Sequence, residues 1–189
     1  EIEDGYIVIL KDRVISLIEK DDYIIVESNE EKDLEKIVYD YLDLERDYKE
    51  IEKEIIQRDK NLKDALIFSR GLKMIHQDPF ETIISYIISA NNNIKRISRS
   101  VNDISKRFGK EVEFEGEKYY LFPTLEEMKD VTIDDLLNDG TGFRARYIKK
   151  DIEYFLENPN FLKDLSSLNT KQATRVLTSL MGVGPKVAD

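Results

Sequence analysis

Apolar residues change their spacing along the chain near residues 29–33. Before this point they form short runs rich in Ile, Val and Tyr between charged segments, a pattern that favours β-strands. After it, beginning with Leu34, Ile37 and Val38, they recur at intervals of three and four residues, which is typical of helices. The pattern predicts an α+β protein, with a small N-terminal antiparallel sheet followed by a mainly α-helical domain. We expect strands at 6–10, 14–18 and 23–27, and we assign residues 1–30 to the remnant of a β domain and residues 31–189 to a helical domain.

The clearest helix start in the sequence lies at Asp78. Aspartate suits the N-cap position, Pro79 has the backbone angle of a first helical residue, and Glu81 can return a capping hydrogen bond. This helix should run over residues 79–90, with isoleucines giving it the broad apolar face of a buried helix. The polar run Asn91–Asn93 should end it, because asparagine favours turns.

Caps and turn residues predict further elements in the second half of the chain. We expect a helix at 94–108 that ends before Gly109, followed by a small hairpin at 112–122. Helices should also begin at Thr124 and cover residues 133–137, 144–156 and 171–181.

The closing residues, Leu177–Asp189, have the pattern of a helix, a Gly-Val-Gly turn and a second helix. Gly182 and Gly184 allow close approaches that side chains would block, Val183 can pack between the helices, and Pro185 suits a first helical turn. Such a turn directs free backbone N–H groups outward, where they can hold a DNA phosphate without reading sequence. An ordinary tight turn between helices is the alternative, and structural context must separate the two.

Charge is unevenly distributed along the chain, which has a formal net charge of -10. Residues 1–60 hold 20 acidic and 10 basic side chains, whereas residues 61–189 hold 19 of each. Within the neutral part, the stretches 95–110 and 144–150 are locally basic. They are candidate contacts for phosphate, and the alternative is that both are solvated helix faces.

Composition excludes several classes of protein. The sequence has no cysteine, so disulfides, thiolate metal sites and cysteine nucleophiles are absent from these residues. The single histidine, His76, argues against a His-ligated metal centre or a Ser-His triad. No stretch has the roughly 18 consecutive apolar residues of a membrane span, and Glu1 opens an acidic segment without a signal-peptide pattern. We expect a globular protein in the cytoplasm.

Four motifs, in this order, resemble the oxoguanine DNA glycosylase family, within the helix-hairpin-helix DNA glycosylase superfamily. The resemblance spans roughly residues 6–189, and four motifs together are far more specific than any one of them. The motifs are Asp78-Pro79-Phe80-Glu81, Ser89-Ala90-Asn91-Asn92-Asn93-Ile94, Gly140-Thr141-Gly142-Phe143-Arg144-Ala145-Arg146-Tyr147 and Gly182-Val183-Gly184-Pro185-Lys186-Val187-Ala188-Asp189.

The resemblance implies that Lys186 is the catalytic nucleophile of a bifunctional glycosylase and lyase. In the family, the lysine at this position attacks C1′ of the damaged nucleoside, displaces the base and leaves a Schiff base that can undergo β-elimination. A position just inside a helix N-terminus, partly desolvated, favours the unprotonated amine that this attack requires. A surface lysine that touches phosphate is the alternative. The lesion implied is 8-oxoguanine, preferably opposite cytosine.

The resemblance also implies how the enzyme handles the base pair that it opens, because a base inside a duplex must be extruded before it can be excised. Asn91 would fill the vacated space, Phe143 would wedge into the stack, and Arg96 and Arg144 would bond the estranged cytosine. Relatives commonly carry tyrosine in place of Phe143, so a phenolic hydroxyl is missing here. Further DNA contacts are expected from Asn93, His76, Gly182 and Gly184, with capping, helix connection or solvated charge as the alternatives.

The expected partner is damaged double-stranded DNA, bound by a monomer without a membrane. No cofactor is expected, and no metal ligand set is visible in the side chains, although hairpins of this family often hold a cation through backbone carbonyls. The family's catalytic aspartate should lie beyond the residues given, and Asp189 is not that aspartate.

Two other functions remain open from the sequence. One is another enzyme of the superfamily, such as an adenine or oxidised-pyrimidine glycosylase. The other is a non-catalytic module that uses the hairpin only as a phosphate anchor; such a module would bind DNA in a salt-sensitive way without lesion preference or a covalent intermediate.

Overall fold

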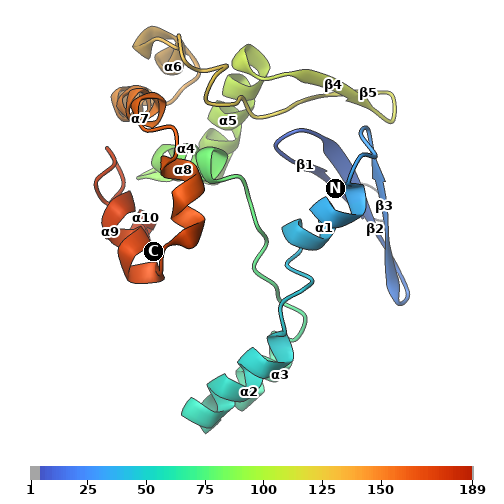
Figure 1. The fold of residues 1–189 in the computed structure, drawn as a ribbon. Helices are drawn as coiled ribbons and strands as arrows, with labels where there is room; N and C mark the ends of the chain where they lie inside the picture. The colour runs from blue at the N-terminus through green and yellow to red at the C-terminus, as the bar shows by residue number, and fades with distance from the viewer. Residues whose placement is uncertain (1–4, 189) are drawn as a thin grey trace. The chain divides into compact units, whose positions relative to one another are not determined.

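A computed structural model describes residues 5–188 (Figure 1). It begins with a three-stranded antiparallel sheet in the order β1-β2-β3, in which Ile7 pairs with Ser16 and Ile18 with Ile25. The α+β class predicted from the sequence is confirmed, since the sheet precedes a mainly helical remainder. The strands are β1 (Gly5–Ile9), β2 (Val14–Lys20) and β3 (Tyr23–Ser28).

Contacts between residues divide the chain into two compact units. One unit joins the residues up to Glu30 with those from Asp78 onward, and the other is Glu31–Gln77. The second unit holds α1 (Leu34–Tyr41), α2 (Tyr48–Arg58), the 3-10 turn η1 (Lys60–Leu62) and α3 (Lys63–Phe68).

The first unit carries most of the remaining helices. Its elements are α4 (Pro79–Ser89), α5 (Ile94–Phe108), β4 (Glu111–Phe114), β5 (Glu117–Tyr120), α6 (Ile133–Asn138), η2 (Gly142–Arg144), α7 (Ala145–Glu157), α8 (Phe161–Asp164), η3 (Leu165–Ser167), α9 (Thr170–Leu177) and α10 (Pro185–Ala188).

Helix α4 begins at the predicted cap. The Asp78 side chain accepts hydrogen bonds from the backbone N–H groups of Phe80 at 3.0 Å and Glu81 at 3.1 Å. Pro79 occupies the first turn, as expected. Within the described residues only this half of the capping box forms, because the Glu81 carboxyl does not return a bond to Asp78. The carboxyl is instead partly buried, and burial first, then the neighbouring Asp78 charge, raises its pKa to about 7.

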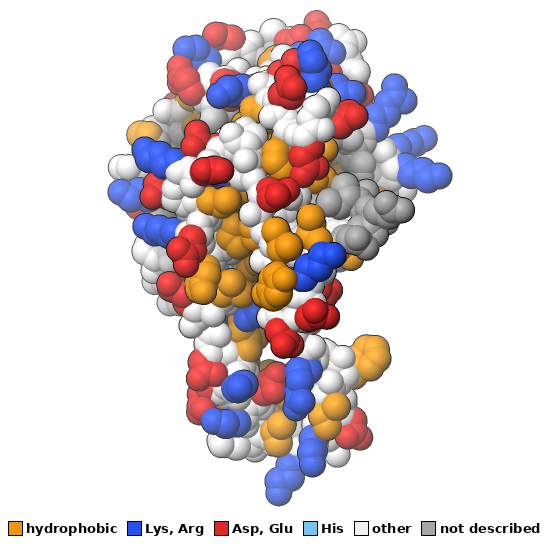
Figure 2. All heavy atoms as spheres, turned by 90° about the vertical axis from the view of Figure 1, so that its right-hand side faces the viewer, with side chains coloured by type: hydrophobic (Ala, Val, Ile, Leu, Met, Phe, Trp, Pro, Cys, Tyr) orange, Lys and Arg blue, Asp and Glu red, His pale blue; other side chains and the backbone are white. Residues whose placement is uncertain are grey.

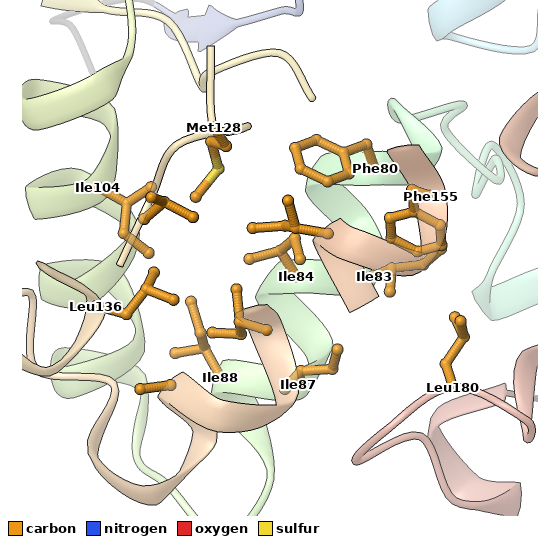
Figure 3. Packing of buried hydrophobic residues seen from close by; sticks show 14 of the residues in the cluster. Phe80, Ile83, Ile84, Ile87, Ile88, Ile104, Met128, Leu136, Phe155 and Leu180 are labelled. Carbon is orange, nitrogen blue, oxygen red and sulfur yellow. The ribbon is translucent and has the colours of Figure 1, made fainter. Parts of the chain in front are cut away.

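The main core forms around the isoleucine face of α4. Figure 3 shows Ile84 and Ile88 pointing between Ile104 of α5 and Leu136 of α6, while Phe80 and Ile83 lie toward Phe155 of α7. Phe80 packs edge to face on Phe155, with ring centroids 6.0 Å apart. Helix α4 has 11 residues, and none of the helices in the described part of the chain is long and apolar enough to cross a membrane.

A smaller core joins the hairpin of β4 and β5 to the three-stranded sheet. Val14 of β2 packs with Val112 and Phe114 of β4 and with Leu121, which follows β5. Glu115 and Gly116 connect the two strands of the hairpin with positive φ angles of 52° and 77°. This is the predicted turn, since two left-handed residues match the twist of a tight hairpin.

Two predicted helix boundaries are wrong. No helix begins at Thr124: residues 125–130 form turns, although Thr124 and Glu127 make the expected mutual hydrogen bonds. Only seven residues separate Thr124 from Thr132, the N-cap of α6, so the segment closes a turn over buried Met128 instead of forming a helix. The helix expected at 171–181 ends at Leu177, and turns follow.

The core around α4 should dominate the stability of the first unit. We predict that Ile87→Ala lowers the free energy of unfolding by about 2–5 kcal/mol, because it leaves a cavity at a fully buried position. Ile133→Ala removes the same atoms from a 39% exposed side chain and should cost less than about 1 kcal/mol. Urea denaturation compares the two variants, and equal losses would contradict this view of the core.

Candidate functional site

The last segment of the described chain forms the predicted helix, turn and helix. Helix α9 ends at Leu177, turns span residues 178–182, and α10 begins at Pro185. Val183 is 7% exposed and belongs to the main core, as does Leu180. The expectation that Val183 packs inward is therefore confirmed, while Lys186, in the first turn of α10, is exposed.

Gly182 is required by both its backbone angle and its neighbour. Its φ is 80°, a left-handed value that side chains rarely adopt. A Cβ atom added there would lie 2.8 Å from Cδ2 of Tyr147 on α7. Gly184 differs, because a Cβ atom there would meet no atom of residues 5–188 within 4 Å. The hairpin turn therefore lies directly against α7 at Gly182 and is open at Gly184.

The Gly-Phe-Arg turn lies immediately before α7. Phe143 is 57% exposed, which the wedge role implied by the resemblance requires. Its ring is held from two sides: the Tyr147 ring packs edge to face at a centroid distance of 5.9 Å, and the Arg144 guanidinium lies 4.5 Å from the ring centre. An exposed apolar ring is thus fixed in direction by its neighbours.

Arg144 is buried, and its guanidinium bonds backbone carbonyls. Nε donates to the Ala90 carbonyl at 2.9 Å, and one terminal nitrogen donates to the carbonyls of Ala90 and Asn91, the latter at 3.0 Å. The other terminal nitrogen donates to the Thr141 carbonyl at 3.2 Å. In this structure Arg144 therefore ties the Gly-Phe-Arg turn to the end of α4, and it would have to exchange these bonds to reach a base.

The Asn-Asn-Asn turn divides its side chains between two tasks. Asn93 caps α5 by accepting from the Arg96 N–H at 3.1 Å, and the Asn92 side chain bonds the Ile88 carbonyl at 3.0 Å. Asn91 has a left-handed φ of 50°, and its exposed side chain makes no hydrogen bond to the described residues. Asn91 is thus available for an external partner, whereas Asn93 already has a capping role.

These contacts bring three of the four sequence motifs together along α7. Gly182 lies on Tyr147, Tyr147 on Phe143, and Arg144 on Asn91, so the hairpin and the two turns form one continuous surface of the first unit. The exposed Arg96 follows the Asn-Asn-Asn turn on α5. The fourth motif, at the start of α4, places the core that carries this surface.

The two basic stretches are only partly available to an anion. Arg99 pairs with Asp103, Arg107 pairs with Asp139 at 2.7 Å, and Lys149 pairs with Glu153. The basic side chains of the two stretches that remain unpaired within the described residues, apart from Arg144, are Lys95, Arg96, Lys106, Lys110, Arg146 and Lys150.

The side of the molecule that carries the three-stranded sheet in Figure 1 has a mixed surface. Figure 2 shows Lys and Arg interspersed there with Asp and Glu around a group of hydrophobic side chains. Large apolar side chains exposed on the sheet include Tyr6, Tyr23 and Ile24. A DNA backbone favours clustered positive charge, so these apolar side chains of the sheet do not form a phosphate-binding surface.

His76 belongs to the other compact unit and has acidic neighbours. Its Nδ1 lies 3.2 Å from Asp40, its Nε2 lies 3.6 Å from Asp43, and its backbone N–H donates to the Tyr41 carbonyl. These carboxylates oppose the approach of a phosphate, and the predicted DNA contact of His76 stays a prediction. No group of three or more His, Asp or Glu side chains within residues 5–188 is arranged to hold a metal ion.

Asp151 is a residue that the sequence analysis did not single out. It lies on α7, four residues after Tyr147, and its Oδ1 accepts a hydrogen bond from the Met181 N–H at 2.8 Å. A signal was present in the sequence, because Asp151 interrupts an apolar stripe formed by Ile148, Ile152 and Phe155. An acidic residue in such a stripe needs a buried partner.

Comparison with known proteins first gives the class of fold. The 3-methyladenine DNA-glycosylase from Archaeoglobus fulgidus superposes with a TM-score of 0.72 over 97% of this chain and 65% of its own, at 24% sequence identity. At this identity the likeness shows the fold alone, which is that of a DNA glycosylase.

Closer relatives define the family. The profile of the 8-oxoguanine DNA glycosylase N-terminal domain matches residues 1–83. A protein of Methanothermobacter thermautotrophicus named "Probable N-glycosylase/DNA lyase" is 35% identical over 151 residues, covering 69% of this chain and 48% of that protein. The 8-oxoguanine glycosylase/lyase of Clostridium acetobutylicum, solved with double-stranded DNA containing cytosine opposite 8-oxoG, is 36% identical with a TM-score of 0.88 over 97% of this chain and 63% of its own.

The chain belongs to the oxoguanine DNA glycosylase family. This confirms the resemblance drawn from the four motifs. The chain spans about half the length of the curated relatives it matches.

Substitutions of the two hairpin glycines should distinguish effects on stability from effects on DNA binding. We predict that Gly182→Ala lowers the thermal midpoint by several degrees, because it strains a left-handed residue against Tyr147. Gly184→Ala adds a methyl group with no described residue within 4 Å and should leave the midpoint unchanged. If the open side of the turn faces DNA, Gly184→Ala should nevertheless weaken duplex binding in a fluorescence-anisotropy titration. Unchanged binding would contradict a backbone approach to phosphate at Gly184.

Proposed function

We propose that the protein is a bifunctional DNA glycosylase and lyase that removes 8-oxoguanine, preferably opposite cytosine, with Lys186 as the nucleophile. The observation that carries the proposal is the Gly-Val-Gly-Pro-Lys hairpin, buried at Val183 and exposing Lys186, in a chain of this family. The relative from Clostridium acetobutylicum, crystallised with DNA containing cytosine opposite 8-oxoG, supports the choice of lesion.

Lys186 would act as an amine nucleophile. Its neutral nitrogen forms a bond to C1′ of the damaged nucleoside while the bond from C1′ to the base breaks and the base leaves with that electron pair. Opening of the sugar gives a Schiff base between C1′ and the lysine nitrogen, from which β-elimination cleaves the strand. Because Lys186 is exposed in the free chain, the water exclusion that favours a neutral amine must come from the bound duplex or from further parts of the protein.

The surface along α7 would open the duplex. The exposed Phe143 ring suits a wedge between bases, and the free Asn91 side chain suits the space that an extruded base leaves. The backbone N–H groups of the hairpin turn would hold phosphate without reading sequence. Arg96 and Arg144 would bond the acceptor edge of the estranged cytosine with their planar guanidinium groups. Arg144 would first release the carbonyls of Ala90 and Asn91.

We further propose that the partner is damaged double-stranded DNA, that the protein binds it as a monomer, and that it works in the cytoplasm. One continuous surface on a single unit supports binding without a second copy. The other two functions are separated by experiment: a different superfamily enzyme would be trapped on another lesion, and a non-catalytic module would bind without being trapped.

Borohydride trapping tests the nucleophile. We predict that the full-length protein forms a covalent complex with a duplex carrying 8-oxoguanine, and that Lys186→Gln abolishes it while duplex affinity changes less than about threefold. Lys171→Gln removes an exposed lysine of α9 and is the matched control, which should trap as the wild type does. Trapping that survives in Lys186→Gln would overturn the assignment.

Opposite-base preference tests the reading of cytosine. Arg96→Ala should reduce the preference for cytosine over the other three bases by about tenfold or more, since a good bidentate contact contributes roughly 1–3 kcal/mol of discrimination. Lys95→Ala removes the exposed lysine next to Arg96 on α5, which has no ion pair within the described residues, and should weaken binding to all four duplexes alike and reduce its salt dependence. The measurement is the single-turnover rate on 8-oxoguanine opposite each base. An unchanged preference in Arg96→Ala would remove Arg96 from this role.

A further inference from the structure

A buried carboxylate on α7 holds the backbone of the hairpin turn. Asp151 is 2% exposed, and its Oδ1 accepts from the N–H of Met181, a residue that is itself 40% exposed. Within the described residues this is the hydrogen bond that joins residues 178–184 to another element, because the remaining bonds of the segment stay inside the hairpin. In the part of the chain that the structure describes, one hydrogen bond therefore joins the turn to the rest of the unit.

Apolar contacts seat the turn on the same side of α7. Tyr147 lies one helical turn before Asp151, so both side chains share a face of the helix. Tyr147 meets the turn at Gly182, directly after Met181. Leu180 and Val183, on either side of this pair, are buried in the main core. Packing therefore fixes the position of the backbone at residues 180–183, and the hydrogen bond to Asp151 fixes its orientation.

The buried carboxyl of Asp151 lowers the stability of the folded protein. Its Oδ2 is buried and has no hydrogen-bond partner among the described residues. Burial raises the pKa of its carboxyl from 3.8 to about 6, against the lowering effect of the Met181 N–H, and no charged side chain of the described residues contributes. Because the folded pKa lies above the unfolded one, the ionised carboxylate costs stability as the pH rises from about 4 to 6. An uncharged side chain at this position would avoid that cost.

We propose that Asp151 is a positioning residue of the active site, which holds the hairpin turn through the Met181 N–H and thereby sets the direction in which Lys186 leaves the start of α10. Only four residues separate Met181 from Lys186, and two of them are glycines, whose backbone can adopt angles that other residues rarely reach. The inference rests on the proposed function for the role of Lys186, but the hydrogen bond and its effect on the turn do not.

Two substitutions at Asp151 separate the hydrogen bond from the charge. Asp151→Ala removes the acceptor and should slow single-turnover trapping at saturating duplex by on the order of tenfold or more, because small misplacements of a reacting group are costly. Asp151→Asn keeps a carbonyl oxygen for the Met181 N–H and should restore the rate to within about threefold of the wild type. Duplex affinity should change less than the rate in both variants.

The control variant is Ile152→Val, which trims the neighbouring buried residue of α7 and leaves the hydrogen bond intact. It should lower the thermal midpoint without slowing trapping at a temperature where the protein stays folded. If Asp151→Ala slows trapping no more than Ile152→Val does, or if Asp151→Asn is as slow as Asp151→Ala, the positioning role is refuted.

Amide hydrogen exchange tests the bond without any reaction. In the full-length wild type the N–H of Met181 should exchange slowly despite the exposure of the residue, and Asp151→Ala should accelerate it while Asp151→Asn should not. Fast exchange at Met181 in the wild type would overturn the proposal even if no variant folds. If exchange behaves as predicted but the wild type is not trapped on any lesion, the proposed function is refuted, whereas the hydrogen bond between Asp151 and the hairpin turn is confirmed.

Discussion

Burial of the isoleucine face of α4 is the constraint on which the rest of the first unit depends. This helix is covered by α5 and α7, with Leu136 of α6 reaching the same core, and its C-terminal end fixes the carbonyls of Ala90 and Asn91 in space. Arg144 closes onto those carbonyls and so sets where α7 begins. Helix α7 then carries, on one face, the residues that seat the hairpin. The positions of Arg144, of α7 and of the hairpin turn thus all depend on the packing of α4.

Much of this fold could be predicted from local signals. The strands, the cap at Asp78, the end of α5 at Gly109 and the turn at Glu115 and Gly116 all depend on neighbouring residues, and all are confirmed. The helix expected at Thr124 does not form. Its capping hydrogen bonds are present, but the segment before the next N-cap is too short for a helix. Propensity and capping act within a turn, whereas the length of an element also depends on what it packs against.

The candidate site was less predictable, because its geometry comes from contacts far apart in the sequence. The motifs identified Arg144 and Gly182. They did not show that Arg144 donates hydrogen bonds to Ala90, 54 residues away, or that Gly182 lies against Tyr147. Asp151 was overlooked because its partner, Met181, is a backbone N–H 30 residues away, which no pattern of side chains reveals. Buried polar groups of this kind are costly unless paired, and two of them, Arg144 and Asp151, lie on the elements where the motifs meet.

The central claim is that the hairpin delivers Lys186 to the damaged nucleoside. The most direct measurement is to trap the full-length protein with borohydride on an 8-oxoguanine duplex opposite cytosine, digest the complex and locate the modified residue by mass spectrometry. The account predicts a sugar adduct on the peptide containing Lys186. An adduct on another lysine, or stoichiometric binding with no adduct at all, would contradict it.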